Sequence, residues 1–162
     1  MIFHYLVKIL LYCKNCSNVF LFQVRKSISY LMRFLYPLFY WQVWLHNLGT
    51  AQSGDNCLYH EKDEKFSLDL DASESKRFLF VSPESKTTRF VFYLDISKPN
   101  EGLKVLTPRV EGVSTYASHR GDHFFVKRRS DVCFNSELLA CPVDNISATT
   151  VLLPHRERYG LI

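Results

Sequence analysis

Acidic residues are missing from the first third of this 162-residue chain. Residues 1–54 carry five Lys or Arg side chains and no Asp or Glu, and the first carboxylate is Asp55. The rest of the chain is close to neutral, so the net charge of +4 describes the N-terminal segment. A nucleic-acid-binding domain carries a basic stripe on its folded part. The body has a single basic cluster, residues 127–129, which we interpret as a solvated strand end, and we predict no nucleic-acid partner.

The sequence also lacks the cysteine pattern of a disulfide-stabilised protein. Its five cysteines, an odd number, have irregular spacing, which does not indicate a disulfide framework. Three of them, Cys57, Cys133 and Cys141, sit among apolar residues and are predicted to behave as small buried hydrophobic side chains. Free thiols are typical of reducing compartments. We therefore expect an intracellular protein, most simply a cytosolic one.

Metal-binding motifs are incomplete as well. Cys13 and Cys16 have C-x-x-C spacing, but a structural zinc site needs about four ligands and no second pair follows. A redox site of this spacing needs a βαβ setting, which the sequence does not indicate. The glycosylation sequons at Asn15 and Asn145 have no secretory context. We assign no metal and no cofactor to the chain.

No apolar run in residues 1–41 is long enough to span a membrane. Basic side chains interrupt this apolar, aromatic segment before it reaches the roughly 18–20 residues that a spanning helix needs. Its Leu, Phe, Tyr and Met residues cluster without glycine, which predicts a helix. Three interpretations stay open: a replacement segment that belongs to no domain, an amphipathic membrane anchor, or a targeting sequence for an organelle.

The body of the chain repeats with a period near 47 residues. Leu58, Val105 and Leu152 occupy equivalent places in apolar segments and are spaced by 47 residues. Internal periods of this size are typical of solenoids and propellers, in which neighbouring units bury each other's faces. Further equivalent segments are 43–50, 90–97 and 138–145, and the pair 72–81 and 117–126.

Each repeat is expected to hold about four short strands. Residues 66–71 alternate apolar and polar side chains, the pattern of a half-buried strand. The continuous apolar runs RFLFV at 77–81 and HFFVK at 123–127 predict strands covered on both faces. We predict an all-β fold: an incomplete β-propeller of two to three four-stranded blades in residues 42–162, preceded by a helical segment in residues 1–41.

The segment VWLHNLGTAQSGDNCLYHEKDEKF at 43–66 resembles the propeller of the prolyl oligopeptidase family of serine peptidases. The resemblance depends on an H-x-L-G-T-x-Q-S-x-D run, and the YHEKDEKF continuation is closer to the oligopeptidase B (protease 2-like) branch. It extends over residues 42–157, through ASHRGDHFFVKRRSD and LLPHRE. The run consists of His46, Leu48, Gly49, Thr50, Gln52, Ser53 and Asp55.

The resemblance implies a two-domain enzyme in the family's complete members. They pair a seven-bladed propeller with an α/β-hydrolase domain that carries a Ser, Asp and His triad. The propeller covers the active site and admits short peptides, and oligopeptidase B cleaves after Lys or Arg. The resemblance therefore implies short peptides as ligands, with a hydrolase domain or self-association as the partner of this propeller.

The chain departs from the family where catalysis is concerned. No G-x-S-x-G nucleophile motif occurs in it, and GVSTY at 112–116 lacks the second glycine. A triad needs a nucleophile, a base and an orienting acid, and the neighbours Ser118 and His119 are better explained as part of a turn. We assign no catalytic residue and predict a truncated propeller that is inactive alone. The alternative is a stand-alone propeller-type binding module for peptides or proteins, tethered to a membrane if residues 1–41 form an anchor.

Overall fold

The computed structural model describes residues 7–12, 20–23, 42–47 and 50–158, and this part of the chain contains strands and two short 3-10 turns but no α-helix. Twelve strands form three four-stranded sheets. The chain divides into two compact units, Met1–Leu68 and Asp69–Ile162. The strands are β1 (Val7–Tyr12), β2 (Phe20–Gln23), β3 (Gln42–Asn47), β4 (Asn56–His60), β5 (Ser67–Ala72), β6 (Phe78–Glu84), β7 (Val91–Asp95), β8 (Lys104–Thr107), β9 (Ser114–Arg120), β10 (His123–Arg129), β11 (Glu137–Pro142) and β12 (Thr150–Leu153), with 3-10 turns at Gln52–Gly54 and Pro99–Glu101.

The first sheet corrects the helix predicted for residues 1–41. Its strand order is β2-β1-β3-β4, and β1 pairs antiparallel with β3 along its whole length. The prediction is wrong for β1 and β2, because the open edge of β3 offers main-chain groups that an apolar segment can satisfy as a strand. Long-range pairing of this kind overrides local helix propensity. The remainder of residues 1–41, including Cys13, Asn15 and Cys16, lies outside the described residues.

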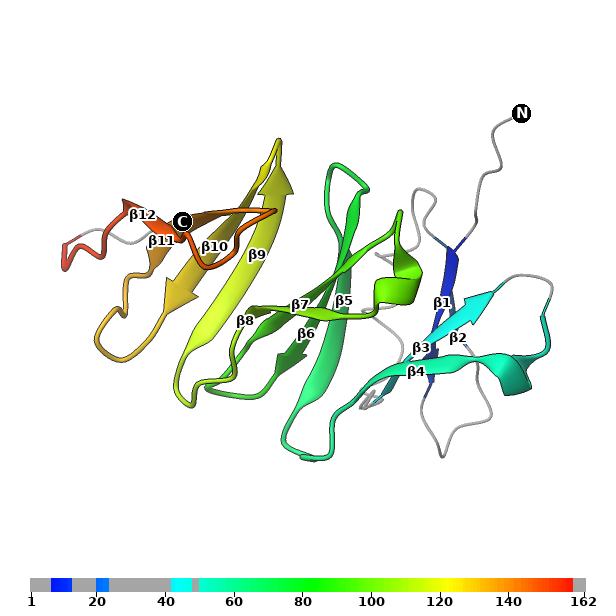
Figure 1. Ribbon diagram of the computed structural model, residues 1–162. Helices are drawn as coiled ribbons and strands as arrows, with labels where there is room; N and C mark the ends of the chain where they lie inside the picture. Colours follow the sequence, from blue (N-terminus) through cyan, green and yellow to red (C-terminus); the bar gives the residue numbers. More distant parts are fainter. Residues whose placement is uncertain (1–6, 13–19, 24–41, 48–49, 159–162) are drawn as a thin grey trace. The chain divides into compact units, whose positions relative to one another are not determined.

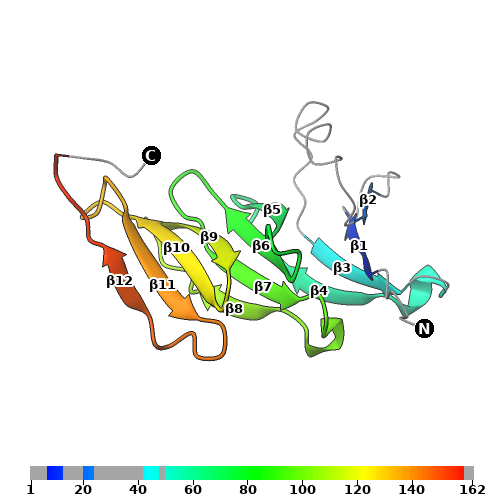
Figure 2. The same cartoon turned by 90° about the horizontal axis from the view of Figure 1, so that it is seen from above.

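The second unit contains two sheets in sequence order, β5-β6-β7-β8 and β9-β10-β11-β12, apart from Ser67 and Leu68 at the start of β5 (Figures 1 and 2). Leu58, Val105 and Leu152 lie in β4, β8 and β12, the last strand of each sheet. The repeat near 47 residues is therefore one four-stranded sheet, as predicted. The all-β, propeller-like fold of two to three blades is confirmed, and the domain boundary at residues 41 and 42 stays a prediction.

Each sheet carries a register shift at the same place. The pairing of the third strand with the fourth slips between Val43 and Trp44, between Val91 and Phe92, and between Leu138 and Leu139. A shift of this kind is a β-bulge, which bends one strand and increases the local twist. The repeat is therefore visible in the position of the register shift as well as in the order of the strands.

An aromatic core joins the two sheets of the second unit. Phe124 in β10 is fully buried and packs against Phe78, Phe80 and Tyr93, with ring centroids 4.9–6.0 Å apart. Edge-to-face pairs such as Phe78 with Phe124 add to the gain from burial. The core continues through Val91, Leu106, Val126, Leu139 and Cys141.

Strand β6 follows the prediction for a doubly covered strand, and β10 does not. Six consecutive residues of β6 are buried, from Phe78 to Pro83. In β10 only Phe124 and Val126 are buried, while Phe125 is half-buried and His123 is exposed. Although its sequence is continuously apolar, β10 therefore alternates buried and more exposed side chains, with one face in the core and the other facing outward.

Main-chain hydrogen bonds tie the two sheets together at one end. The amide of Arg89 donates to the carbonyl of Val113 at 3.0 Å, and the amide of Thr115 donates to the carbonyl of Arg89 at 2.9 Å. The hydroxyls of Thr107 and Thr115 lie 2.7 Å apart, and Thr88 Oγ1 accepts a bond from the amide of Gly112. These contacts fix how the strand ends of the two sheets face each other.

The cysteines only partly match their prediction. Cys141 is buried in the core, whereas Cys133 is half-buried and Cys57 is exposed in the outer strand β4. All three are free thiols. Burial is the larger influence on Cys141 and raises the pKa of its thiol, so this side chain stays neutral. Over the described ranges, no helix is long and apolar enough to cross a membrane.

Candidate functional site

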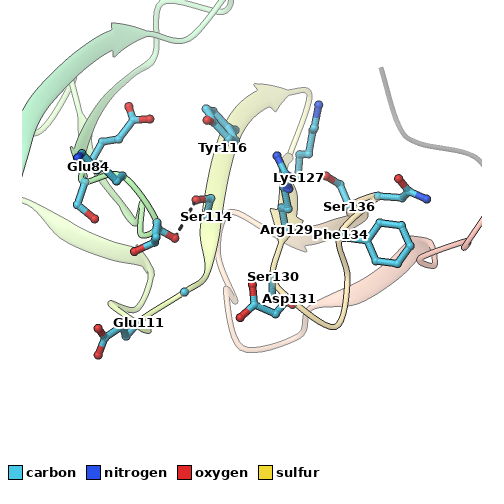
Figure 3. Close-up of a pocket in the computed structure, with 15 residues that line it drawn as sticks. Glu84, Glu111, Ser114, Tyr116, Lys127, Arg129, Ser130, Asp131, Phe134 and Ser136 are labelled. Carbon is cyan, nitrogen blue, oxygen red and sulfur yellow. Dashed lines mark hydrogen bonds between the residues drawn. The ribbon is translucent and has the colours of Figure 1, made fainter.

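A groove of about 910 Å³ opens between the two sheets of the second unit. It lies where the β6–β7 turn, the β8–β9 connection and the β10–β11 loop meet, with the ends of β9 and β10 as one wall (Figure 3). Loops held on a rigid scaffold of strands are where proteins commonly place binding residues. The groove is lined by residues 84–87, 111, 112, 114, 116, 127, 129–131 and 134–136.

Two cross-strand pairs form the wall made by β9 and β10. Lys127 lies opposite Tyr116, and Arg129 lies opposite Ser114. All four residues line the groove. Residues two apart on a strand share one face, so the basic cluster 127–129 divides: Lys127 and Arg129 face the groove, and Arg128 faces away.

Arg128 has a different role from its neighbours. Its Nε donates to Glu137 Oε1 at 2.6 Å across the β10–β11 pair, and Glu137 is buried. This is a cross-strand ion pair of the kind that stabilises sheets. Arg128 and Arg129 are both exposed at the end of β10, which agrees with the interpretation of residues 127–129 as a solvated strand end, although the ion pair with Glu137 was not foreseen.

Arg89 is not among the lining residues of the groove, but it contacts two that are, Glu84 and Tyr116. Its side chain is 11% exposed and forms ion pairs with Glu84 and with Asp69, the latter at 2.9 Å. Burial opposes the charged guanidinium, but the hydrogen bonds and charges of Asp69 and Glu84 prevail and raise the pKa of Arg89 above its ordinary value. The guanidinium also lies 4.6 Å from the centre of the Tyr116 ring. Arg89 therefore holds in place one aromatic side chain of the groove wall.

Charged residues of both signs line the groove: Glu84, Glu111 and Asp131 are acidic, and Lys86, Lys127 and Arg129 are basic. In Figure 3, Glu111 and Asp131 lie at one end, and the cationic groups of Lys127 and Arg129 extend toward the other. Among the described residues, no ion pair involves any of these four side chains. The groove therefore presents a polar surface of mixed charge, in which Glu84 is paired with Arg89.

The β10–β11 loop is held in place by the segment that follows β12. The side-chain nitrogen Nδ2 of Asn135 donates to the main-chain carbonyls of Arg156 and Glu157, at 2.9 and 2.8 Å. The ring of Phe134 packs against His155 with centroids 5.0 Å apart, yet Phe134 remains 51% exposed. This loop therefore presents an apolar surface at the rim of the groove.

The serines considered in the sequence do not form a catalytic site. Ser114, within the segment 112–116, is half-buried, and its hydroxyl lies 3.4 Å from the carbonyl of Thr87. Ser118 and His119 lie in strand β9, so the predicted turn is wrong; the turn comes after them, where Gly121 has a φ of 62°. Adjacent strand residues point to opposite faces, and accordingly Ser118 is exposed whereas His119 is buried.

A serine–imidazole contact exists elsewhere, between residues 44 positions apart. Ser75 Oγ lies 2.8 Å from His119 Nδ1, and the hydroxyls of Ser75 and Ser73 lie 2.9 Å apart. A triad needs an acid that orients the base. In the described structure no carboxylate hydrogen-bonds to either ring nitrogen of His119, which packs against Phe78 and Phe124. We interpret the contact as structural.

The buried His119 predicts a pH dependence of stability. Burial is the larger influence that lowers its pKa, and the charge of Arg77 acts in the same direction while Asp122 opposes it. Because the unfolded chain then binds the proton more readily, this stability term is constant above pH of about 6.5 and declines as the pH falls toward the folded-state pKa. Thermal melts of the wild type and His119→Gln at pH 7.5 and 5.0 measure it: the variant should lose less Tm on acidification.

His123→Gln provides the matched control for that experiment. His123 is exposed and lies only four residues away, on the strand next to β9. Its replacement should leave the acid-induced loss of Tm as in the wild type. Equal acid sensitivity in His119→Gln and the wild type would show that this imidazole does not carry the effect.

The described residues contain no group of three or more His, Cys, Asp or Glu side chains that could hold a metal ion. Asn145 of the second sequon lies exposed in the β11–β12 loop. Of the family-like run near residue 50, Leu48 and Gly49 lie outside the described residues. The groove is the candidate site, because it combines charged side chains, aromatic side chains and a volume of ligand size.

Comparisons with known proteins identify the repeat. Residues 39–161 match the domain described as "Prolyl oligopeptidase, N-terminal beta-propeller domain". Protease 2 of Moraxella lacunata is 31% identical over 119 residues, which cover 73% of this chain and 17% of that protein. The chain spans about a sixth of the length of the curated relatives that it matches.

Solved structures agree with the sequence comparison. Oligopeptidase B from Trypanosoma brucei, in a closed form with covalently bound antipain, has a TM-score of 0.66 and 29% identity over 74% of this chain and 18% of its own. Oligopeptidase B from Leishmania major has the same TM-score and 31% identity over 74% of this chain and 17% of its own. The chain belongs to the prolyl oligopeptidase family, in its oligopeptidase B branch, and represents part of the N-terminal β-propeller domain.

Proposed function

We propose that this domain contributes to a serine-type oligopeptidase by controlling which peptides reach a hydrolase active site. The observation that carries the proposal is the match of residues 39–161 to the family's propeller domain, together with two consecutive four-stranded sheets packed through a shared core. A ring of such sheets excludes bulky substrates by its size. Short peptides are therefore the substrate class.

The chemistry of bond cleavage would come from residues that this chain does not carry. No G-x-S-x-G motif occurs in the sequence, and the Ser75–His119 contact lacks an orienting acid. The relative from Trypanosoma brucei holds covalently bound antipain in a closed form, which supports peptide-like ligands for a complete member. The partner of this propeller is accordingly a hydrolase domain of the same family.

A chimeric enzyme tests the proposal. Residues 42–158 replace the matching propeller segment of the Leishmania major oligopeptidase B, and cleavage of a short fluorogenic peptide with a basic residue before the scissile bond is compared with cleavage of a folded protein. The chimera should cleave the peptide and spare the protein. A folded chimera that cleaves both at similar rates would contradict the gating role.

The isolated chain is the second arm of this test. It should hydrolyse the fluorogenic peptide no faster than buffer, and a serine-directed phosphonate should leave Ser75 unmodified by mass spectrometry, because the neighbouring imidazole has no orienting acid. Turnover that the phosphonate abolishes would show a catalytic serine in the chain itself.

A second candidate function is an independent peptide-binding module. The groove favours it, because four of the charged residues that line it, Glu111, Lys127, Arg129 and Asp131, form no ion pair among the described residues. Such a module needs its open sheet edges covered by self-association. Size-exclusion chromatography of the chain distinguishes the candidates: a ring-forming module elutes as an oligomer, and a propeller that awaits a hydrolase domain does not.

A further inference from the structure

We propose that Ser75 and His119 form a latch that holds the β5–β6 turn against β9 at neutral pH and releases it when His119 takes up a proton. Ser75 belongs to this turn, residues 73–77, and His119 lies near the end of β9. Both residues belong to the second unit of the chain. The proposal concerns the packing of the two sheets and does not depend on the gating role.

The latch joins the two sheets at one end of β9, and main-chain hydrogen bonds join them at the other. Thr115, near the start of β9, donates its amide to the carbonyl of Arg89 at 2.9 Å. His119 lies four residues further along, about 13 Å away at the rise of a β-strand. There Ser75 Oγ lies 2.8 Å from His119 Nδ1. Release of the turn therefore leaves the sheets joined at the start of β9.

The closed latch suits the neutral form of the His119 ring. The residue is 5% exposed, and its ring packs edge-on against Phe78 and Phe124, with centroid separations of 4.6 and 5.4 Å. Its Nε2 is buried and has no hydrogen-bond partner among the described residues. An imidazolium has two N–H donors and a full charge to satisfy, so protonation in this place is costly.

The charged groups around the ring act in both directions. Burial is the largest influence and lowers the pKa of His119, and the Arg77 guanidinium acts in the same direction, while Asp122 in the β9–β10 turn opposes them. Phe78 of β6 and Phe124 of β10 bring no charge. Because Arg77 belongs to the β5–β6 turn, release of the turn relieves burial and repulsion together.

A cavity of about 440 Å³ lies beside the latch and can receive the charged ring. His119 lines it, together with the end of β5, the start of the turn and the end of β9. The acidic residues Asp71 and Glu74 line it as well, against one cation, Arg120. Burial, followed by the charge of Asp69, raises the pKa of the Asp71 carboxyl, and a neighbouring cation would counter this effect. The cavity therefore favours the imidazolium, as the aromatic site does not.

Electron paramagnetic resonance on the full chain tests the latch. Spin labels are attached to keto amino acids, which leaves the native cysteines unlabelled. One pair replaces Lys76 and Ser118 across the latch, and the other replaces Thr87 and Val110 at the joined end; all four positions are exposed. Between pH 7.5 and 5.0 the longer-distance population of the first pair should rise about tenfold, because the released ring regains a pKa of about 6.5. The second pair should not change.

Variants assign the change to the latch. His119→Gln cannot take up a proton and should keep the first pair at the shorter distance at both pH values. Ser75→Ala removes the latch bond at an exposed position and should show the longer distance already at pH 7.5. His123→Gln, at an exposed position on the neighbouring strand, should respond to acid as the wild type does.

Any of four results would overturn the proposal. They are a first pair that does not respond to acid, equal lengthening of both pairs, an unchanged acid response in His119→Gln, and a Ser75→Ala variant that stays at the shorter distance at pH 7.5. The last result decides the question even if His119→Gln does not fold. Equal lengthening of both pairs would show general loosening of the unit rather than release of one turn.

Discussion

Replacing Phe124 with alanine is expected to lower the free energy of unfolding by about 3–5 kcal/mol, the range for a buried Phe→Ala change. The ring is 0% exposed and joins both sheets of the second unit through Phe78, Phe80 and Tyr93. Its removal leaves a cavity that rigid strands on two sides cannot close, so the cost should lie at the upper end. Urea denaturation measures the change as a lower midpoint at unchanged slope.

Phe125 offers a matched control one residue away. It has the same side chain on the same strand but is half-buried on the opposite face of β10. Phe125→Ala should cost about 1 kcal/mol, because part of its ring is already in water. If Phe124→Ala does not fold, Phe124→Leu should still cost more than Phe125→Leu. Equal costs at the two positions would contradict the assignment of the core.

Replacing Arg89 with methionine is expected to cost about 2 kcal/mol, less than the loss of a fully buried ion pair, because its carboxylate partners can regain water. Asp69 and Glu84 have side chains 55% and 40% exposed, whereas that of Arg89 is only 11% exposed. The variant also loses the contact with the Tyr116 ring. Urea denaturation measures the cost.

Arg77→Met is the control for that variant. Arg77 also has a carboxylate neighbour, Asp95 at 3.9 Å, and also lies over an aromatic ring, that of Phe78 at 4.8 Å. Its side chain is 46% exposed, however, and exposed pairs contribute about 0–1 kcal/mol. A loss at Arg77 as large as that at Arg89 would show that burial is not what gives Arg89 its importance.

Much of the fold could be predicted from the sequence because the information is local and repeated. The period near 47 residues located the final strand of each sheet, at Leu58, Val105 and Leu152. The helix predicted for residues 1–41 was wrong at β1 and β2. Composition alone cannot show that β3 has an edge with which β1 pairs. The partial exposure of Phe125 could not be predicted, because a continuous apolar sequence is compatible with a strand covered on one face or on both.

The groove could not be predicted, because its walls come from segments spread between residues 84 and 136. Alternation along β10 was available as a signal: it places Lys127 and Arg129 on one face and Arg128 on the other. The ion pairs of Arg89 depend on which strand ends meet, and the Ser75–His119 contact joins residues 44 positions apart. Such contacts follow from packing, which one sequence does not encode in any short motif. The cytosolic location inferred from the cysteines stays a prediction.

The repeated bulges bear on how the protein avoids aggregation. The outer strands β4, β8 and β12 each pair with one neighbour only, and β12 exposes Val151, Leu152 and Leu153. Amyloid-like fibrils grow when identical straight strands stack in register. Because the pairing of β4, β8 and β12 with the neighbouring strand slips at the same point, these three edges are bent and offer a poorer template for a second copy. We infer that the register shift that marks the repeat makes the apolar edge at β12 less able to pair with a second copy.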